Sequence, residues 1–215
     1  YTTAGPDDKG HATWEPRNAY EHGGGSTWIT GSYDPDLDLM YWGTGNAGPW
    51  NPKVRKGDNL YTASIVALNA DTGKLQWYFQ PSPHDTHDWD ATETVVLFDA
   101  TINGRPRKLL TQTNRNAFYY VLDRVTGEFI SATEYAKQTW AKGIDAKTGR
   151  PIVNKESLYG LDAISISPGG GGAHNWAPMA FNAKTGLVYI PTSTANSWTY
   201  QQEAKYNPRP GLMTG

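Results

Sequence analysis

Residues 84–90 carry the densest group of chemically active side chains in the sequence, His-Asp-Thr-His-Asp-Trp-Asp. If this stretch is extended, Asp88 and Asp90 point to the same side, because side chains alternate across a strand. Two carboxylates at that spacing can bind one hard cation together, or one can bind while the other accepts a proton from a substrate. The alternative is a polar turn whose acidic side chains cap backbone amides.

The same stretch contains a second candidate site, made of His84, Asp85 and His87. A His-Asp-x-His run can ligate zinc or iron. Without further histidines clustered nearby the ligand set would be incomplete, so this is the weaker of the two predictions.

Other polar and aromatic side chains stand beside glycine-rich corners. Trp28 follows three glycines, Asn46 follows Gly-Thr-Gly, and Asn175 lies shortly after a run of four glycines. Glycine lets the backbone pass close to a flat or bulky group. Each corner also has an ordinary interpretation as a bulge or turn. Arg115, just before an apolar strand, is either a solvent-facing loop residue or part of a site.

The composition favours an all-β protein that holds these corners in place. The 215 residues include 23 Gly, 14 Pro, 9 Trp and 13 Tyr; glycine and proline interrupt helices, and aromatic residues favour strands. A Thr-Gly hairpin turn recurs with its glycine at positions 73, 127 and 186. Hairpins repeating at roughly 40 to 60 residues are typical of β-propellers with four-stranded antiparallel blades, so about four blades are expected.

Two segments are predicted to be irregular. Residues 1–22 are polar and without periodicity, which indicates a long surface loop. Residues 145–149, Asp-Ala-Lys-Thr-Gly, are similar to the hairpin turns but lack flanking apolar strands, so a loop is predicted there as well.

Charge and cysteine content exclude several kinds of function. The net charge is −2, which gives no reason to expect a nucleic-acid or anionic-membrane partner. The absence of cysteine excludes a zinc-thiolate site, a thiol nucleophile and an internal disulfide. An open row of four blades would leave raw sheet faces, so the chain is either a small closed propeller or about half of a larger one; we expect the latter, truncated at both ends.

Together these motifs resemble the dehydrogenases that depend on pyrroloquinoline quinone (PQQ), the quinoprotein family that includes methanol dehydrogenase. The Ala-x-Asn-x-x-Thr-Gly-x-x-x-Trp run ending at Trp77 is similar to the tryptophan-docking motif of that family. The most specific matching pieces are Gly-Gly-Gly-Ser-Thr-Trp, Gly-Thr-Gly-Asn-x-x-Pro-Trp, Pro-His-Asp, Asn-Arg-Asn and His-Asn-Trp. The resemblance implies that residues 1–215 form a partial quinoprotein dehydrogenase domain from the middle of an eight-bladed propeller.

The resemblance also assigns cofactor contacts to four residues. Trp28 resembles the tryptophan on which the planar quinone lies, and Ser26 resembles a hydroxyl that bonds a cofactor carboxylate. Arg115 resembles the side chain that bonds the reactive quinone oxygens, and Asn175 resembles a further polar contact. The chemistry agrees, because an indole face offers stacking area and an arginine fork suits the oxygens of a flat polyanion.

Three residues are implied as metal ligands, Asn46, Asp88 and Asp90, with Asp88 also resembling the catalytic base. A hard cation prefers such oxygen ligands and would act as a Lewis acid on the quinone carbonyl. Asp90 stands two places after Asp88, as in the lanthanide-dependent members, so a lanthanide ion is predicted and Ca²⁺ is the alternative. The reason is charge, since an extra carboxylate attracts a trivalent ion more strongly than a divalent one.

The implied activity is oxidation of alcohols to aldehydes, extending to aldehydes themselves, with electrons passing to a cytochrome c. The implied location is the periplasm, and a homo-oligomer is compatible with the family. A metal-binding glutamate and a pair of adjacent cysteines expected in the family have no counterpart here; they are expected before Tyr1, and the fragment is expected to be inactive alone. The alternative function is a non-catalytic propeller scaffold with the same repeats.

Overall fold

A computed structural model describes residues 2–207 of the chain. Its first four strands form one antiparallel sheet in sequence order, each strand pairing with the next. They are β1 (Ser32–Asp34), β2 (Leu39–Gly43), β3 (Ile65–Asn69) and β4 (Leu75–Phe79). The turn from β3 to β4 closes as the Thr-Gly motif predicts, because the amide of Gly73 donates to the carbonyl of Asn69 at 2.8 Å.

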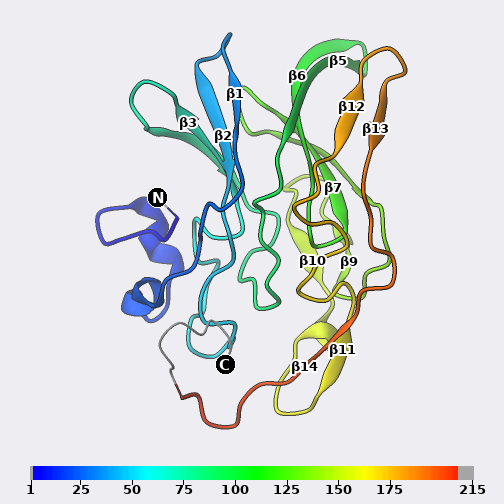
Figure 1. The fold of residues 1–215 in the computed structure, drawn as a ribbon. Coiled ribbons are helices and arrows are strands. Elements are labelled where there is room, and N and C mark those ends of the chain that lie inside the picture. Colours follow the sequence, from blue (N-terminus) through cyan, green and yellow to red (C-terminus); the bar gives the residue numbers. More distant parts are fainter. Residues whose placement is uncertain (1, 208–215) are drawn as a thin grey trace.

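A second sheet repeats this arrangement, also as a four-stranded antiparallel meander. Its strands are β5 (Val96–Ile102), β6 (Arg105–Thr113), β7 (Phe118–Asp123) and β8 (Phe129–Glu134). Figure 1 shows the two sheets next to each other with their strands running in similar directions. These are two complete propeller blades, as the hairpin repeat predicts.

The remaining strands form three two-stranded pieces of further blades. They are β9 (Ala141–Ile144) with β10 (Pro151–Val153), β11 (Ile164–Ile166) with β14 (Trp198–Tyr200), and β12 (Ala180–Asn182) with β13 (Leu187–Tyr189). The helical segments are short 3₁₀ turns, η1 (Lys9–Thr13), η2 (Arg17–His22) and η3 (Lys155–Ser157). The all-β prediction is therefore confirmed. Within residues 2–207, no helix has the length and apolarity to span a bilayer.

Both predictions of irregular segments were wrong. Residues 145–149 form the turn of the β9–β10 hairpin, in which the amide of Gly149 donates to the carbonyl of Asp145 at 2.9 Å. The flanking strands are only four and three residues long, too short to be recognised by periodicity. The first segment is not a plain surface loop either, because η1 and η2 frame Trp14, which is fully buried and donates to the carbonyl of Leu60.

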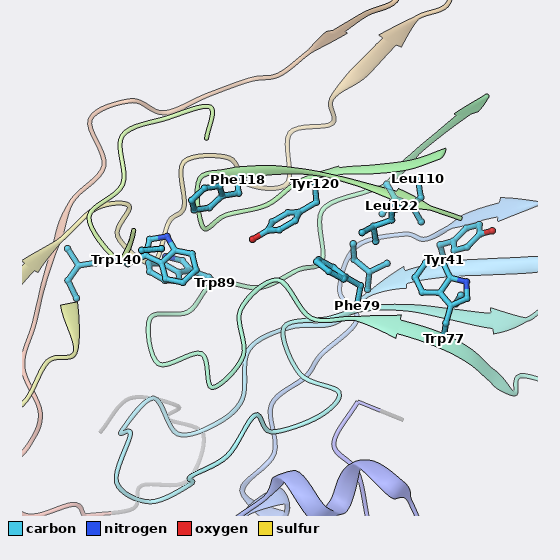
Figure 2. Packing of buried hydrophobic residues seen from close by; sticks show 14 of the residues in the cluster. Tyr41, Trp77, Phe79, Trp89, Leu110, Phe118, Tyr120, Leu122 and Trp140 are labelled. Atoms are coloured by element: carbon cyan, nitrogen blue, oxygen red, sulfur yellow. The ribbon is translucent and has the colours of Figure 1, made fainter. Parts of the chain in front are cut away.

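The main core lies between the first two blades and extends toward the loops that follow them. Figure 2 shows aromatic side chains from both blades in this cluster, with Tyr41 and Trp77 at one end and Trp89 and Trp140 at the other. The hydroxyl of Tyr41 and the indole N–H of Trp77 both donate to the carbonyl of Arg124, at 2.9 and 3.2 Å. Two aromatic side chains of the first blade are thus anchored to the β7–β8 turn of the second.

The Arg124 side chain adds a charged link between the blades. Its Nε donates to Asp34 at 2.5 Å and its Nη1 donates to Asp99 at 2.5 Å. Asp34 and Arg124 are both buried, so each charge is compensated by its partner in the other blade.

Candidate active site

Residues 84–90 form an irregular loop and not the extended strand that the spacing argument assumed. Asp88 has a φ of 72°, in the left-handed region that few non-glycine residues adopt. Asp88 and Asp90 still approach a common partner, because Asp88 Oδ2 lies 3.8 Å from Arg115 Nη1 and Asp90 Oδ2 lies 3.3 Å from Arg115 Nη2. Strand alternation was therefore the wrong reason for their proximity.

Asp85 fixes the conformation of this loop. Its two carboxylate oxygens accept from the backbone amides of His87 and Trp89, at 3.0 and 2.9 Å, on either side of Asp88. The backbone carbonyl of Asp85 accepts from the buried guanidinium of Arg55. Asp85 thus fulfils the alternative prediction of an acidic side chain that caps backbone amides.

The zinc or iron site proposed from His84, Asp85 and His87 finds no support. Burial lowers the pKa of His87 to about 3, and its ring stacks on Trp89 with centroids 4.3 Å apart. His84 contacts the carbonyl of Arg55 through Nε2 at 2.9 Å. Across residues 2–207, no three His, Cys, Asp or Glu side chains group together as a metal site. These side chains organise the loop and its packing.

Asp90 is the centre of the candidate site. It is buried, and its Oδ2 accepts from the indole N–H of Trp28 at 2.7 Å while its Oδ1 accepts from the backbone amide of Asn46 at 2.6 Å. Gly45 makes this approach possible, because a Cβ there would lie 2.9 Å from Asp90 Oδ1 and 3.1 Å from Ser26 Oγ. The two glycine-rich corners that carry Ser26, Trp28 and Asn46 therefore meet at Asp90.

Arg115 brings the third glycine-rich corner, the one before Asn175, to the same place. Its Nη1 donates to the backbone carbonyls of Asp88 and Gly170, at 3.0 and 3.1 Å, and its Nη2 donates to Asn175 Oδ1 at 3.3 Å. Gly172 accommodates the side chain, since a Cβ at that position would lie 2.7 Å from Arg115 Cγ. Arg115 itself is 6 % exposed, so its charge is held in place beneath the surface.

Trp28 forms the open side of this group. Its side chain is 46 % exposed, unlike the buried Asp90 and Arg115 beneath it. The guanidinium carbon of Arg115 lies 5.4 Å from the centroid of the indole ring, within the range of a cation–π contact. A flat ligand on the exposed part of this ring would have an arginine and two carboxylates at its edge.

The electrostatics of the site suit proton transfer. Burial and the neighbouring Asp90 raise the pKa of Asp88 to about 7, against the opposing effect of Arg115. A carboxyl group with such a pKa can exchange a proton near neutral pH, as a general base requires. The structure thus brings all seven predicted site residues together, while their roles toward a cofactor and a cation stay predictions.

Sequence reasoning missed Glu93, a further acidic residue of this site. It is 2 % exposed, and its Oε1 lies 3.3 Å from Nε of Arg115. Burial raises its pKa to about 8. The one signal in the sequence is an isolated acidic residue in the otherwise uncharged run from Ala91 to Leu97, which no motif singled out.

Comparison with known proteins agrees with this geometry. Residues 2–151 match the PQQ family described as glucose/ethanol/alcohol dehydrogenase, beta-propeller domain. The chain belongs to this family. As a quinoprotein dehydrogenase chain, it is 47 % identical over 197 residues to quinohemoprotein alcohol dehydrogenase ADH IIB of Pseudomonas putida, a match that covers 90 % of this chain and 28 % of the relative.

Solved structures of the family superpose well on this quinoprotein chain. Quinohemoprotein alcohol dehydrogenase ADHIIG from Pseudomonas putida HK5 matches with a TM-score of 0.92 and 43 % identity, over 97 % of this chain and 33 % of that structure. A europium-containing methanol dehydrogenase matches with a TM-score of 0.83 and 40 % identity, over 89 % and 33 %. The chain therefore spans about a third or less of the length of these relatives.

Proposed function

We propose that the protein containing this chain oxidises alcohols to aldehydes with PQQ as the electron-accepting cofactor. The single observation that carries the proposal is the meeting of Trp28, Asp88, Asp90 and Arg115, which come from one glycine-rich corner, the 84–90 loop and the turn between β6 and β7. A scaffold needs its core and docking tryptophans, but it has no need of buried acids beside an exposed indole. Membership of a family of quinone-dependent alcohol dehydrogenases supports the same reaction.

The donor set suits PQQ. The half-exposed face of Trp28 offers a stacking surface, and its N–H is already fixed by Asp90. Arg115 presents charged donors beside the ring, Asn175 adds a side-chain amide that contacts Arg115, and Ser26 adds a hydroxyl next to Gly45. In this proposal Ser26, Trp28, Arg115 and Asn175 hold the cofactor, which when bound supplies the acceptor for hydride from the alcohol.

The oxygen donors suit a hard cation. Asn46, Asp88 and Asp90 offer one amide and two carboxylates, the ligand types that calcium and the lanthanides prefer. Oδ2 of Asp90 accepts one hydrogen bond from Trp28, Oδ1 accepts one from the backbone amide of Asn46, and Arg115 contacts Oδ2 as an ion pair. Each oxygen therefore keeps one lone pair for a cation. We propose a lanthanide ion here with Ca²⁺ as the alternative, because two carboxylates compensate a trivalent charge better than one.

The protein's own part in the reaction centres on Asp88. Its carboxylate takes the hydroxyl proton of the alcohol as hydride leaves the adjacent carbon, so the products are an aldehyde and protonated Asp88. Arg115 keeps the loop carbonyl of Asp88 in place at 3.0 Å. Asp85 holds the same loop from the other side through two backbone amides.

The location, the substrates and the electron acceptor that we propose are those of the whole protein. We place it in the periplasm, with a small primary alcohol as substrate, aldehydes as further substrates and a cytochrome c as electron acceptor. The names of the quinohemoprotein relatives support a haem-linked electron path. We also propose that residues 1–215 form part of one propeller domain. A homo-oligomer is compatible with this arrangement.

The test uses the protein encoded by the whole gene, because this chain spans 28 % of the ADH IIB relative. The metal-free protein is titrated with PQQ in the presence of lanthanum or calcium, and alcohol oxidation is followed with an artificial electron acceptor. We expect turnover only with both PQQ and a cation. Binding of neither, in a folded protein, would favour the scaffold alternative.

A further inference from the structure

Glu93 is a buried neighbour of Arg115 at the Nε atom of its guanidinium. Its side chain is 2 % exposed, and neither of its carboxyl oxygens finds a hydrogen-bond partner among residues 2–207. Nε of Arg115 is likewise buried without a hydrogen bond in this part of the chain. Oε1 of Glu93 and Nε of Arg115 are 3.3 Å apart, so an acceptor and a donor that both lack hydrogen bonds lie next to each other.

The three nitrogens of Arg115 have different partners. Its Nη1 donates to the carbonyls of Asp88 and Gly170, and its Nη2 donates to the side chain of Asn175, a proposed cofactor contact. Its Nε reaches only Glu93. A guanidinium is planar, so fixing the Nε edge determines where both terminal nitrogens point.

A buried carboxyl group without this purpose would be unfavourable. Burial of an unpaired polar group destabilises the folded protein, and leucine in its place would remove that penalty. The oxygens of Glu93 can accept a hydrogen bond from Nε whether the group is ionised or protonated, because the protonated form keeps acceptor capacity. Residue 93 must therefore supply a hydrogen-bond acceptor, whereas a negative charge at this residue is less important.

We propose that Glu93 is a positioning residue that orients the guanidinium of Arg115 toward the cofactor through contact with its Nε. The inference rests on the proposed function, in which Arg115 contacts PQQ. It assigns to Glu93 no contact with cofactor, cation or substrate. Its effect must therefore pass entirely through Arg115.

The test compares Glu93→Leu, Glu93→Gln and Arg115→Lys in the protein encoded by the whole gene, with PQQ affinity and kcat measured separately from KM. Leucine removes the acceptor, so PQQ affinity should weaken by about tenfold or more, the size expected when a buried charged donor loses its partner. Glutamine keeps an acceptor oxygen and should restore PQQ affinity to within about twofold of wild type. The control, Glu128→Gln, alters an exposed glutamate that pairs with Arg107 and should match wild type.

The decisive result is the double variant. Lysine has no Nε–H donor fixed in a plane, so Glu93→Leu should add nothing to the loss caused by Arg115→Lys. Additive losses, or wild-type PQQ affinity in a folded Glu93→Leu protein, would overturn the inference. If Glu93→Leu does not fold, PQQ affinity in Glu93→Gln decides, since a tenfold loss there contradicts the need for an acceptor alone.

The same variants test the role of Glu93 and the proposed function independently. Unchanged PQQ affinity and turnover in Arg115→Lys would remove the proposed role of Arg115 and the inference with it. A large loss in Arg115→Lys beside wild-type behaviour in Glu93→Leu would leave the proposed function intact and overturn the role of Glu93.

Discussion

The indole N–H of Trp28 donates a 2.7 Å hydrogen bond to Oδ2 of Asp90, across 62 positions of sequence. One residue is the proposed stacking floor for the cofactor and the other a proposed metal ligand. Replacing either residue therefore removes a hydrogen bond from the other. The orientation of the Trp28 ring and the position of the Asp90 carboxylate depend on the same contact.

Replacing Asp90 by serine should change the preference for the cation. The variant loses one carboxylate and the acceptors for Trp28 and Asn46, so attraction to a trivalent ion should fall more than attraction to calcium. We expect lanthanum to activate the wild type more than calcium does, and Asp90→Ser to lose that preference. Equal ratios of lanthanum to calcium activation in both proteins would show that Asp90 has no part in metal choice.

Asp85→Ala should disorder the loop that carries Asp88. The substitution leaves the amides of His87 and Trp89 without their acceptor, and each unpaired buried amide costs about 1–3 kcal/mol. We expect kcat to fall at least tenfold with a smaller change in KM, since the base is displaced while other contacts stay. The control is Asp71→Ala, an exposed turn residue; equal kcat in the two variants would contradict the role given to Asp85.

Glu93 should make the folded state less stable as pH rises. Burial raises its pKa to about 8, so the folded protein keeps a proton that the unfolded chain releases above an ordinary pKa of about 4.3. Its contribution is fully present below that ordinary pKa and is lost as pH rises through 8. Urea midpoints at pH 5 and pH 8 should therefore fall more in the wild type than in Glu93→Gln. Equal falls would mean that Glu93 is not held protonated.

Arg124→Met should destabilise the packing of the first two blades. It leaves Asp34 buried without its ion-pair partner and removes the contact with Asp99, and breaking a buried pair costs about 3–5 kcal/mol. The control is Arg150→Met, which breaks a pair with Asp58 in which both side chains are more than a third exposed and for which a loss of at most about 1 kcal/mol is expected. If both variants lose a similar free energy of unfolding in urea, the Arg124–Asp34 pair stabilises the protein no more than an exposed ion pair does.

The hairpin repeat predicted the blades because it is a local signal. The turn at Gly73 closes with bonds between near neighbours, and such turns depend only on the residues in them. The β9–β10 hairpin was missed because Pro151–Val153 and Ala141–Ile144 are only three and four residues long, too short to show a period. Trp14 was missed for a related reason, since its burial comes from contacts with distant residues such as Leu60.

The site residues were predictable because their motifs are specific, but their arrangement was not. Asp88 and Asp90 were brought together by an assumed strand, whereas the loop reaches Arg115 through a left-handed residue and the two amides held by Asp85. Glu93 belongs to no motif, and only its burial against Nε of Arg115 marks it. Contacts of this kind depend on packing between segments far apart in sequence.

The most direct measurement compares wild type and Asp88→Asn in the protein encoded by the whole gene, loaded with PQQ and lanthanum. Asparagine keeps the size and the loop position of Asp88 but cannot accept the alcohol proton as a base. Both proteins should bind PQQ with similar affinity, and alcohol oxidation by the variant should fall by a factor of about 10² or more. Wild-type turnover in a PQQ-loaded Asp88→Asn protein would contradict the proposal that Asp88 is the base.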